Sequence, residues 1–367
     1  MFSAAIARHI RGALVAALLG ASLLIVGGAG ALAKEKESVH VGLWTWPAFG
    51  PWYVIKEQNL APNVDLKISL FEDPYAAFSL MAAGKLDVFA GTIEVGPITA
   101  EQRWPVKLVS MTELSYGTDR IIVGPEIKKP EDLKGKKVAV LIGGLAHIMV
   151  AMWLEQNGVD PNDVEFVNLI MDDATGAMIN GSIAAAEFWW PYGDEVLENL
   201  PGSRVVANAK DPFWLEQGII ADALYVHDDM LNDPDRRDAM VELMRAFYDA
   251  KEWWRTNTTE ANKFYAESFG YKVEDVEAVI GPDGTPYEGG LYVYNFLEEA
   301  RFCGAAPGDP PLNQVNGQIY KVWRLTNDWW LKLGLMEKRI PAMRGIDCSL
   351  LQELYETGYA GEPEPNY

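Results

Sequence analysis

The sequence has few of the residues that build metal sites: two cysteines and four histidines among 367 residues. They are scattered along the chain rather than placed at the short spacings that zinc and related metals need. The sequence therefore predicts no structural metal and no cofactor. Cys303 and Cys348 leave two possibilities open, a disulfide that holds the C-terminal segment or two free thiols.

Positive charge is also scarce. Lys and Arg together number 31 against 52 Asp and Glu, which gives a formal net charge of -21. Such a surface repels phosphate backbones and anionic lipid heads, so a nucleic-acid partner and peripheral membrane binding are excluded. The overall charge says nothing about a ligand held in a local cleft.

The signatures of nucleotide binding and hydrolysis are absent. The sequence has no G-x-G-x-x-G, no phosphate-binding loop with Gly-Lys-Ser/Thr, no G-x-S-x-G elbow and no H-E-x-x-H. We therefore expect a binding protein rather than an enzyme, with no catalytic residue. A periplasmic enzyme or a ligand-sensing module remains the alternative.

One long apolar run occurs, from Ala13 to Val26, after the basic residues Arg8 and Arg11. Small residues and then Ala33 follow it, in the order of a secretory signal peptide. The sequence predicts a signal peptide over 1–33 and a monomeric, soluble, periplasmic protein that begins at Lys34. An uncleaved N-terminal anchor is the competing interpretation.

Short apolar runs alternate with helical patterns through the first two thirds of the chain. This alternation favours parallel strands joined by crossover helices, an α/β fold. The clearest helix is 145–156, where apolar residues recur at helical spacing. The predicted strands are 39–44, 64–70, 87–90, 106–111, 120–123, 138–141, 165–169 and 184–189.

Two segments about 97 residues apart, 81–88 and 178–185, have the same order of helix end, glycine and strand. The repeat favours two similar lobes, although two common helix-Gly-strand corners would look alike by coincidence. From about Asp228 onward the pattern becomes helical, and we expect this tail to pack on the first lobe.

Ligands of open parallel sheets lie beyond the carboxyl ends of the strands, so the loops there supply candidate site residues. Trp44 and Trp189 lie close to the strands, as cavity wall or as core. Glu94 suits either a cationic ligand or the first turn of a helix. His147, off the apolar stripe, is either exposed or a ligand contact. The candidates for ligand binding are Trp44, Trp46, Thr92, Glu94, Tyr116, Gly144, His147, Trp189 and Trp190.

The run Lys129-Pro-Glu-Asp-Leu-Lys-Gly-Lys-Lys-Val-Ala-Val140, followed by the Gly143-Gly144 helix start, resembles a known family. This family contains the binding proteins of ABC importers for nitrate, sulfonates, taurine and thiamine-pyrimidine precursors, some of its relatives being enzymes. The resemblance implies a two-lobed periplasmic binding protein (type II) fold, with two doubly wound sheets joined by hinge strands. It implies a first lobe of 34–124 plus 226–367 and a second lobe of 125–225, with a permease and an ATPase subunit as partners.

Carried over residue by residue, the resemblance places Trp46, Thr92, Gly144, His147 and Trp190 at ligand-facing positions. Two departures matter: Leu145 and Ala146 stand where hydroxyl residues are frequent, and Ala184 stands where Asp is frequent. Fewer hydroxyl donors disfavour nitrate or a sulfonate, because such an anion needs several hydrogen-bond donors in place of the water it loses on binding. Within the expected class of small nitrogen- or sulfur-containing ligands, the tryptophans and Glu94 favour a cationic or heteroaromatic molecule.

Overall fold

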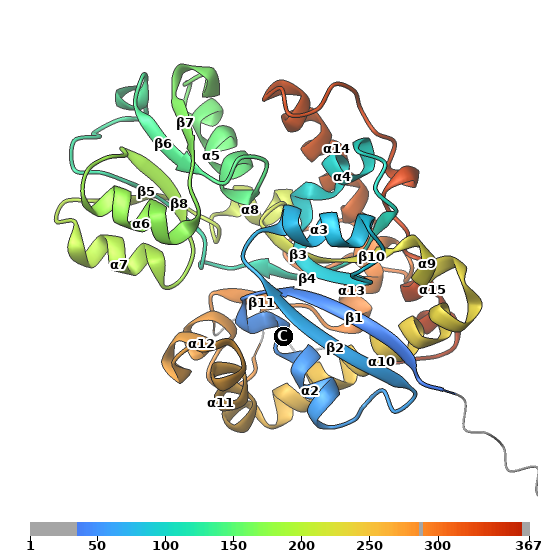
Figure 1. Ribbon diagram of the computed structural model, residues 1–367. Coiled ribbons are helices and arrows are strands. Elements are labelled where there is room, and N and C mark those ends of the chain that lie inside the picture. Colours follow the sequence, from blue (N-terminus) through green and yellow to red (C-terminus); the bar gives the residue numbers. More distant parts are fainter. Residues whose placement is uncertain (1–34, 286–288, 362–367) are drawn as a thin grey trace, which may run out of the picture. The chain divides into compact units, whose positions relative to one another are not determined.

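The computed structural model describes residues 35–285 and 289–361, so the predicted signal peptide lies outside the described residues. Two separate mixed sheets form the framework (Figure 1). The larger has the order β11-β4-β10-β3-β1-β2. Its strands are β1 (Glu37–Trp44), β2 (Val64–Phe71), β3 (Val88–Thr92), β4 (Val106–Ser115), β10 (Ala221–His227) and β11 (Leu291–Val293).

The smaller sheet has the order β7-β6-β8-β5-β9. Its strands are β5 (Arg120–Val123), β6 (Lys137–Val140), β7 (Glu165–Asn168), β8 (Ala185–Phe188) and β9 (Arg204–Asn208). We call each sheet with its helices a lobe, the first lobe holding the larger sheet. The predicted α/β fold of two sheets is confirmed, and every strand expected from the apolar runs is present.

Pairing across the sheets is only partly parallel. β1 pairs parallel with β2 and β3, and β6 with β7 and β8. β10 lies antiparallel between β3 and β4, and β5 lies antiparallel between β8 and β9. β5 and β10 are each the first strand after the chain crosses from one sheet to the other. Each enters its new sheet from the end at which the neighbouring strands finish, and it therefore runs antiparallel to them.

The crossings lie at 116–119 and 218–220, a few residues before the expected ones near Gly124 and 222–226. Hydrogen bonds place the crossings there, because β5 already pairs with β8 and β9 of the smaller sheet and β10 already pairs with β3 and β4 of the larger one. We call the two crossings the hinge segments. The repeat seen in the sequence is structural, since Gly84 (φ 64°) and Gly181 (φ 76°) each turn the chain out of a helix towards β3 or β8.

Helices flank both sheets, and several begin at residues suited to cap them. Asp73 accepts a hydrogen bond from the backbone N–H of Tyr75 (2.9 Å), and Asn295 and Glu298 form a capping box. The helices before the tail are α2 (Pro51–Glu57), α3 (Pro74–Ala82), α4 (Gly96–Glu101), α5 (Leu145–Gln156), α6 (Met171–Ile179), α7 (Tyr192–Asn199) and α8 (Pro212–Gln217).

The C-terminal part is helical, as expected, and it packs mainly on the first lobe. α10 contacts α2, β1 and β2, α13 and α15 contact β4, and α14 contacts α4 and also α5 of the second lobe. The tail helices are α9 (Asp228–Asn232), α10 (Pro234–Thr256), α11 (Thr258–Phe269), α12 (Val273–Ile280), α13 (Phe296–Cys303), α14 (Gln318–Lys332) and α15 (Ser349–Glu356). None of the helices within the described ranges is long and apolar enough to cross a membrane.

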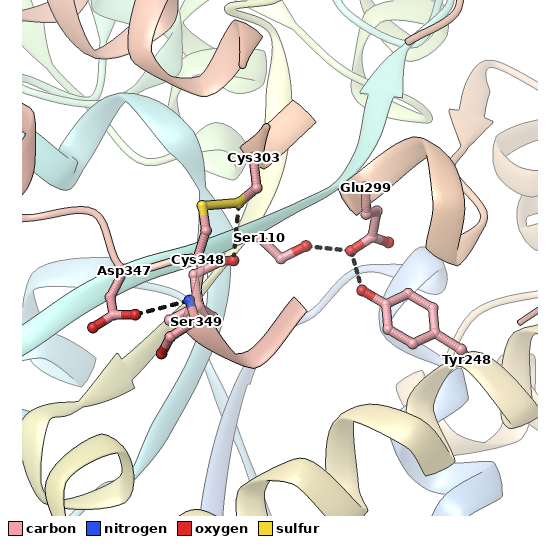
Figure 2. The surroundings of a disulfide bond; sticks show 8 residues. Ser110, Tyr248, Glu299, Cys303, Asp347, Cys348 and Ser349 are labelled. Carbon is pink, nitrogen blue, oxygen red and sulfur yellow. Dashed lines mark hydrogen bonds between the residues drawn. A yellow bond between two sulfur atoms is a disulfide. The ribbon is translucent and has the colours of Figure 1, made fainter. Parts of the chain in front are cut away.

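Two buried connections hold the tail against β4 (Figure 2). Cys303 of α13 and Cys348, at the start of α15, form a disulfide, which decides between the two possibilities left open by the sequence. Nearby, Glu299 accepts a hydrogen bond from Tyr248 (2.7 Å) and pairs with Lys251 (2.7 Å). Glu299 also accepts a hydrogen bond from Ser110 of β4, so these contacts join α10, α13 and α15 to the strand that carries part of the site described next (Figure 2).

Candidate functional site

A cavity of about 480 Å³ lies between the two lobes at the hinge segments. Residues at the carboxyl ends of β1, β3, β6, β7 and β8 line it, as expected for this class of sheet. Strands β4 and β10 and the hinge segments add further lining, and Phe269, Tyr271 and Leu291 come from the tail.

Six of the nine predicted ligand contacts line this cavity: Trp44, Trp46, Thr92, Glu94, Gly144 and Trp189. Trp44, at the end of β1, meets Trp189, just after β8, edge to face with ring centroids 6.2 Å apart. Tyr75 of the first lobe also donates a hydrogen bond to the carbonyl of Gly143 in the second (3.0 Å). The lobes therefore touch at two points beside the cavity. We call Trp44, Trp46 and Trp189 the aromatic wall.

The other three candidates lie outside the lining. Tyr116 lies in a hinge segment with the Lys210 ammonium 4.7 Å from its ring centroid. Trp190 is half-buried, and its indole N–H finds no acceptor among the described residues. His147 is 4% exposed, which corrects the expectation of an exposed histidine, and it does not line the cavity.

His147 instead supports the glycine loop. Its Nδ1 accepts a hydrogen bond from the backbone N–H of Gly143 (3.3 Å), and its ring contacts Phe166 and Trp330. Burial lowers the pKa of His147 to about 4, so the ring is neutral at physiological pH. Trp330 belongs to α14, far along the chain, and the local helical pattern could not show that it covers this side chain.

Glu94 occupies a single turn of 3₁₀ helix directly after β3 and is fully buried. Thr92 donates a hydrogen bond to its Oε1 (2.7 Å), whereas Oε2 receives none from the described residues. Burial raises the pKa of Glu94 to about 7; the Thr92 hydroxyl opposes this rise and the Asp119 charge adds to it. Glu94 therefore lies both in the first turn of a short helix and in the cavity lining.

Besides Glu94, the described lining holds six carboxyl groups that sequence reasoning missed as site residues: Glu72, Glu113, Asp119, Asp172, Glu187 and Asp222. Glu113 of β4 lies opposite Asp222 of β10 in the sheet register, and the two carboxyls hydrogen bond. Burial, and then the charge of Glu113, raise the pKa of Asp222 well above its ordinary value. Burial raises the pKa of Glu113 as well, so the pair holds a shared proton between its two carboxyls. We call Glu94, Glu113, Asp119, Glu187 and Asp222 the acid cluster.

The remaining pair crosses between the lobes. Asp119, in a hinge segment, accepts a hydrogen bond from Thr118 (2.8 Å) and faces Glu187 of β8. No described N–H or O–H donor reaches either Glu187 oxygen, so these two carboxyls bond only by sharing a proton. Burial and the Asp119 charge raise the pKa of Glu187 well above its ordinary value. In the sequence, Glu187 stands out only as a carboxylate within the apolar run 184–189.

Replacing Glu94 with Gln should stabilise the protein without ligand above pH 7. The folded pKa lies above the unfolded one, so the native state loses stability as pH rises from about 4.5 to 7. At pH 8 the free energy of unfolding of the variant should exceed that of the parent by about 3 kcal/mol, because each unit of pKa difference contributes about 1.4 kcal/mol. The charged or titratable groups facing this carboxyl are Tyr75, Asp119, Glu187, Asp222 and Tyr225.

Urea unfolding of both proteins at pH 4.5 and pH 8 measures this effect. The two should be nearly equal at pH 4.5, where the unfolded carboxyl is half protonated and the native one fully so. Equal stability at both values of pH would contradict a raised pKa at Glu94.

Comparisons with known proteins agree with this architecture. The family described as NMT1/THI5 like matches residues 47–260. A protein of Bacillus subtilis (strain 168) that is named for binding aliphatic sulfonates is 22% identical over 347 residues, which cover 91% of this chain and 94% of the relative.

Two solved structures share the fold. The alkanesulfonate-binding protein SsuA from Xanthomonas axonopodis pv. citri, bound to MOPS, has a TM-score of 0.65 at 17% identity, covering 86% of this chain and 99% of the other. The periplasmic nitrate-binding protein NrtA from Synechocystis PCC 6803 has a TM-score of 0.64 at 12% identity, covering 89% and 90%. The family match spans more than half of the sequence, and this chain therefore belongs to the NMT1/THI5-like family.

Proposed function

We propose that this protein is the periplasmic solute-binding component of an ABC importer. It captures a small nitrogen- or sulfur-containing molecule between its lobes and delivers it, as a monomer, to a permease that works with an ATPase subunit. The observation that carries the proposal is the cavity at the hinge segments, lined from both lobes. Membership of the NMT1/THI5-like family supports it.

The geometry suits capture by closure. A ligand in the cavity touches both lobes only when they meet, so its binding free energy favours the closed form. The contacts between Trp44 and Trp189 and between Tyr75 and Gly143 are two points beside the cavity at which the lobes meet, and α14 meets α5 at another. A permease that recognises the closed form would then accept loaded protein in preference to empty protein.

Replacing Trp189 with Ala should weaken ligand binding by about 1–3 kcal/mol, because ring burial and stacking are lost. This is roughly one to two decades in Kd. The measurement is calorimetric titration with the ligand released from protein purified without dialysis. Trp253 lies on α10 away from the cavity, so Trp253→Ala is the matched control and should leave Kd unchanged. Equal affinity of the parent and Trp189→Ala for the ligand would show that the ligand does not bind in this cavity.

A periplasmic enzyme on the same fold is the second candidate. The observation that favours it is the set of cavity carboxyls whose pKa burial raises, since such groups can exchange protons near neutral pH. Mass spectrometry of the released ligand after long incubation separates the two. An importer component returns the ligand unchanged, and a new mass would establish turnover.

A further inference from the structure

The acid cluster gives the cavity one sign of charge. Its members come from both lobes: Glu94, Glu113 and Asp222 from the first, Glu187 from the second, and Asp119 from a hinge segment. None of the described residues that line the cavity is a Lys, Arg or His. An anion that leaves water needs positive charge or several donors in exchange, and this lining offers acceptors instead.

Several carboxyl oxygens of the cluster are buried and receive no N–H or hydroxyl donor from the described residues. They are Oε2 of Glu94, both oxygens of Glu187 and Oε1 of Glu113, and the last two side chains bond within the cluster only through the protons they share with Asp119 and Asp222. These three side chains are at most 2% exposed. Buried acceptors without partners are rare in native proteins, so this set requires an explanation. N–H donors supplied by a ligand would satisfy Glu94 and would replace the shared protons of the two carboxyl pairs.

The two basic side chains whose charges lower the pKa of cluster members, Arg120 and Lys251, are paired with acids outside the cluster. Arg120 donates to a carboxylate oxygen of Asp194 (3.1 Å) and forms an ion pair with it through its second nitrogen. Lys251 is bound to Glu299. Neither side chain lines the cavity, so a positive charge inside the cavity would come with the ligand.

The size and lining of the cavity distinguish an organic cation from a metal ion. About 480 Å³ is far more space than a coordinated ion fills. Within 35–285 and 289–361, no three His, Cys, Asp or Glu side chains are arranged to hold a metal. The aromatic wall faces the same space, and it offers apolar surface and ring faces that attract cations.

Building on the solute-binding function proposed above, we propose that the ligand is a di- or polyamine. Its ammonium groups donate to the acid cluster, and its alkyl chain lies against the aromatic wall. The two carboxyl pairs and Glu94 give places for more than one ammonium group. Closure of the lobes places Glu187 and Asp119 around these groups together with the acids of the first lobe.

Calorimetric titration of the full exported protein tests the proposal. The probes are spermidine, butane-1,4-diamine, tetramethylammonium, methanesulfonate and calcium. Spermidine or butane-1,4-diamine should bind at micromolar concentration or below, and the other three should show no heat at roughly millimolar concentration. Tetramethylammonium carries the charge without an N–H group, so it isolates the contribution of the donors.

Glu187→Gln should weaken amine binding by roughly 30-fold or more, because the amide cannot ionise when the cation arrives. Gln has the shape of the protonated acid, so the fold should be kept; the melting temperature without ligand checks this. Glu198 is an exposed acid on α7 of the same lobe, and Glu198→Gln should leave the affinity within about two-fold.

Four results would overturn the inference: tighter binding of methanesulfonate or calcium, equal binding of tetramethylammonium, unchanged affinity in Glu187→Gln, or no binding of either amine. Native mass spectrometry of the purified protein then separates the two proposals. A different small molecule bound one to one would leave the solute-binding function standing. A protein that carries no small molecule and binds no probe would count against both.

Discussion

Replacing Lys251 with Met should lower the free energy of unfolding by about 3–5 kcal/mol, the range for breaking a buried ion pair. Lys251 is 1% and Glu299 0% exposed, and their charged atoms lie 2.7 Å apart. Without the ammonium, the side-chain donors left to Glu299 among the described residues are the hydroxyls of Tyr248 and Ser110 (Figure 2). A buried carboxylate would then lack its counter-charge, or would have to take up a proton.

Urea unfolding at pH 7 measures the loss. Lys263→Met, on the exposed side of α11, is the matched control and should change stability by less than about 0.5 kcal/mol. Adding Glu299→Gln to Lys251→Met should recover part of the loss, because the amide still accepts from Tyr248 and carries no charge. A loss under about 1 kcal/mol in the single variant would mean that the pair contributes little.

Removing the disulfide through Cys303→Ala and Cys348→Ala should lower the free energy of unfolding by about 4 kcal/mol. The bridge closes a loop between residues 45 apart in sequence. Loop-closure entropy in the unfolded chain gives a value of that size for such a loop. The bridge also fixes α15 beside α13 under β4 (Figure 2).

Guanidinium unfolding with and without dithiothreitol measures this effect. The reductant should shift the parent's midpoint towards that of the double alanine variant and leave the variant unchanged, which serves as the control. Ligand affinity should be the same in both, because neither cysteine lines the cavity. A parent that unfolds identically with and without reductant would contradict a stabilising bridge.

The acid cluster does not suit the ligands for which the proteins that this chain resembles are named. Those names refer to sulfonates and nitrate, which are anions. Here the described lining holds acidic groups and no basic one. A shared fold is compatible with a different ligand, because side chains on the loops and hinge segments, rather than the sheets, determine what a cleft accepts.

The sequence alone determined the sheets and the position of the cleft. Apolar runs specify strands because burial needs only a local pattern, and the loops after those strands pointed to Trp44, Trp46, Glu94 and Gly144 in the cavity lining. The same reasoning indicated a cationic or heteroaromatic ligand from Glu94 and the tryptophans. Whether these residues contact a ligand stays a prediction.

Only the tertiary structure decided which acids are buried and which partners they meet. Glu113 and Asp222 are 109 residues apart in sequence and become neighbours because β10 returns antiparallel to β4. Trp330 from the tail covers His147, which the helical pattern left exposed. The pKa of a side chain depends on the water it loses and the charges it meets, and distant segments supply both. No local pattern in the sequence carries that information.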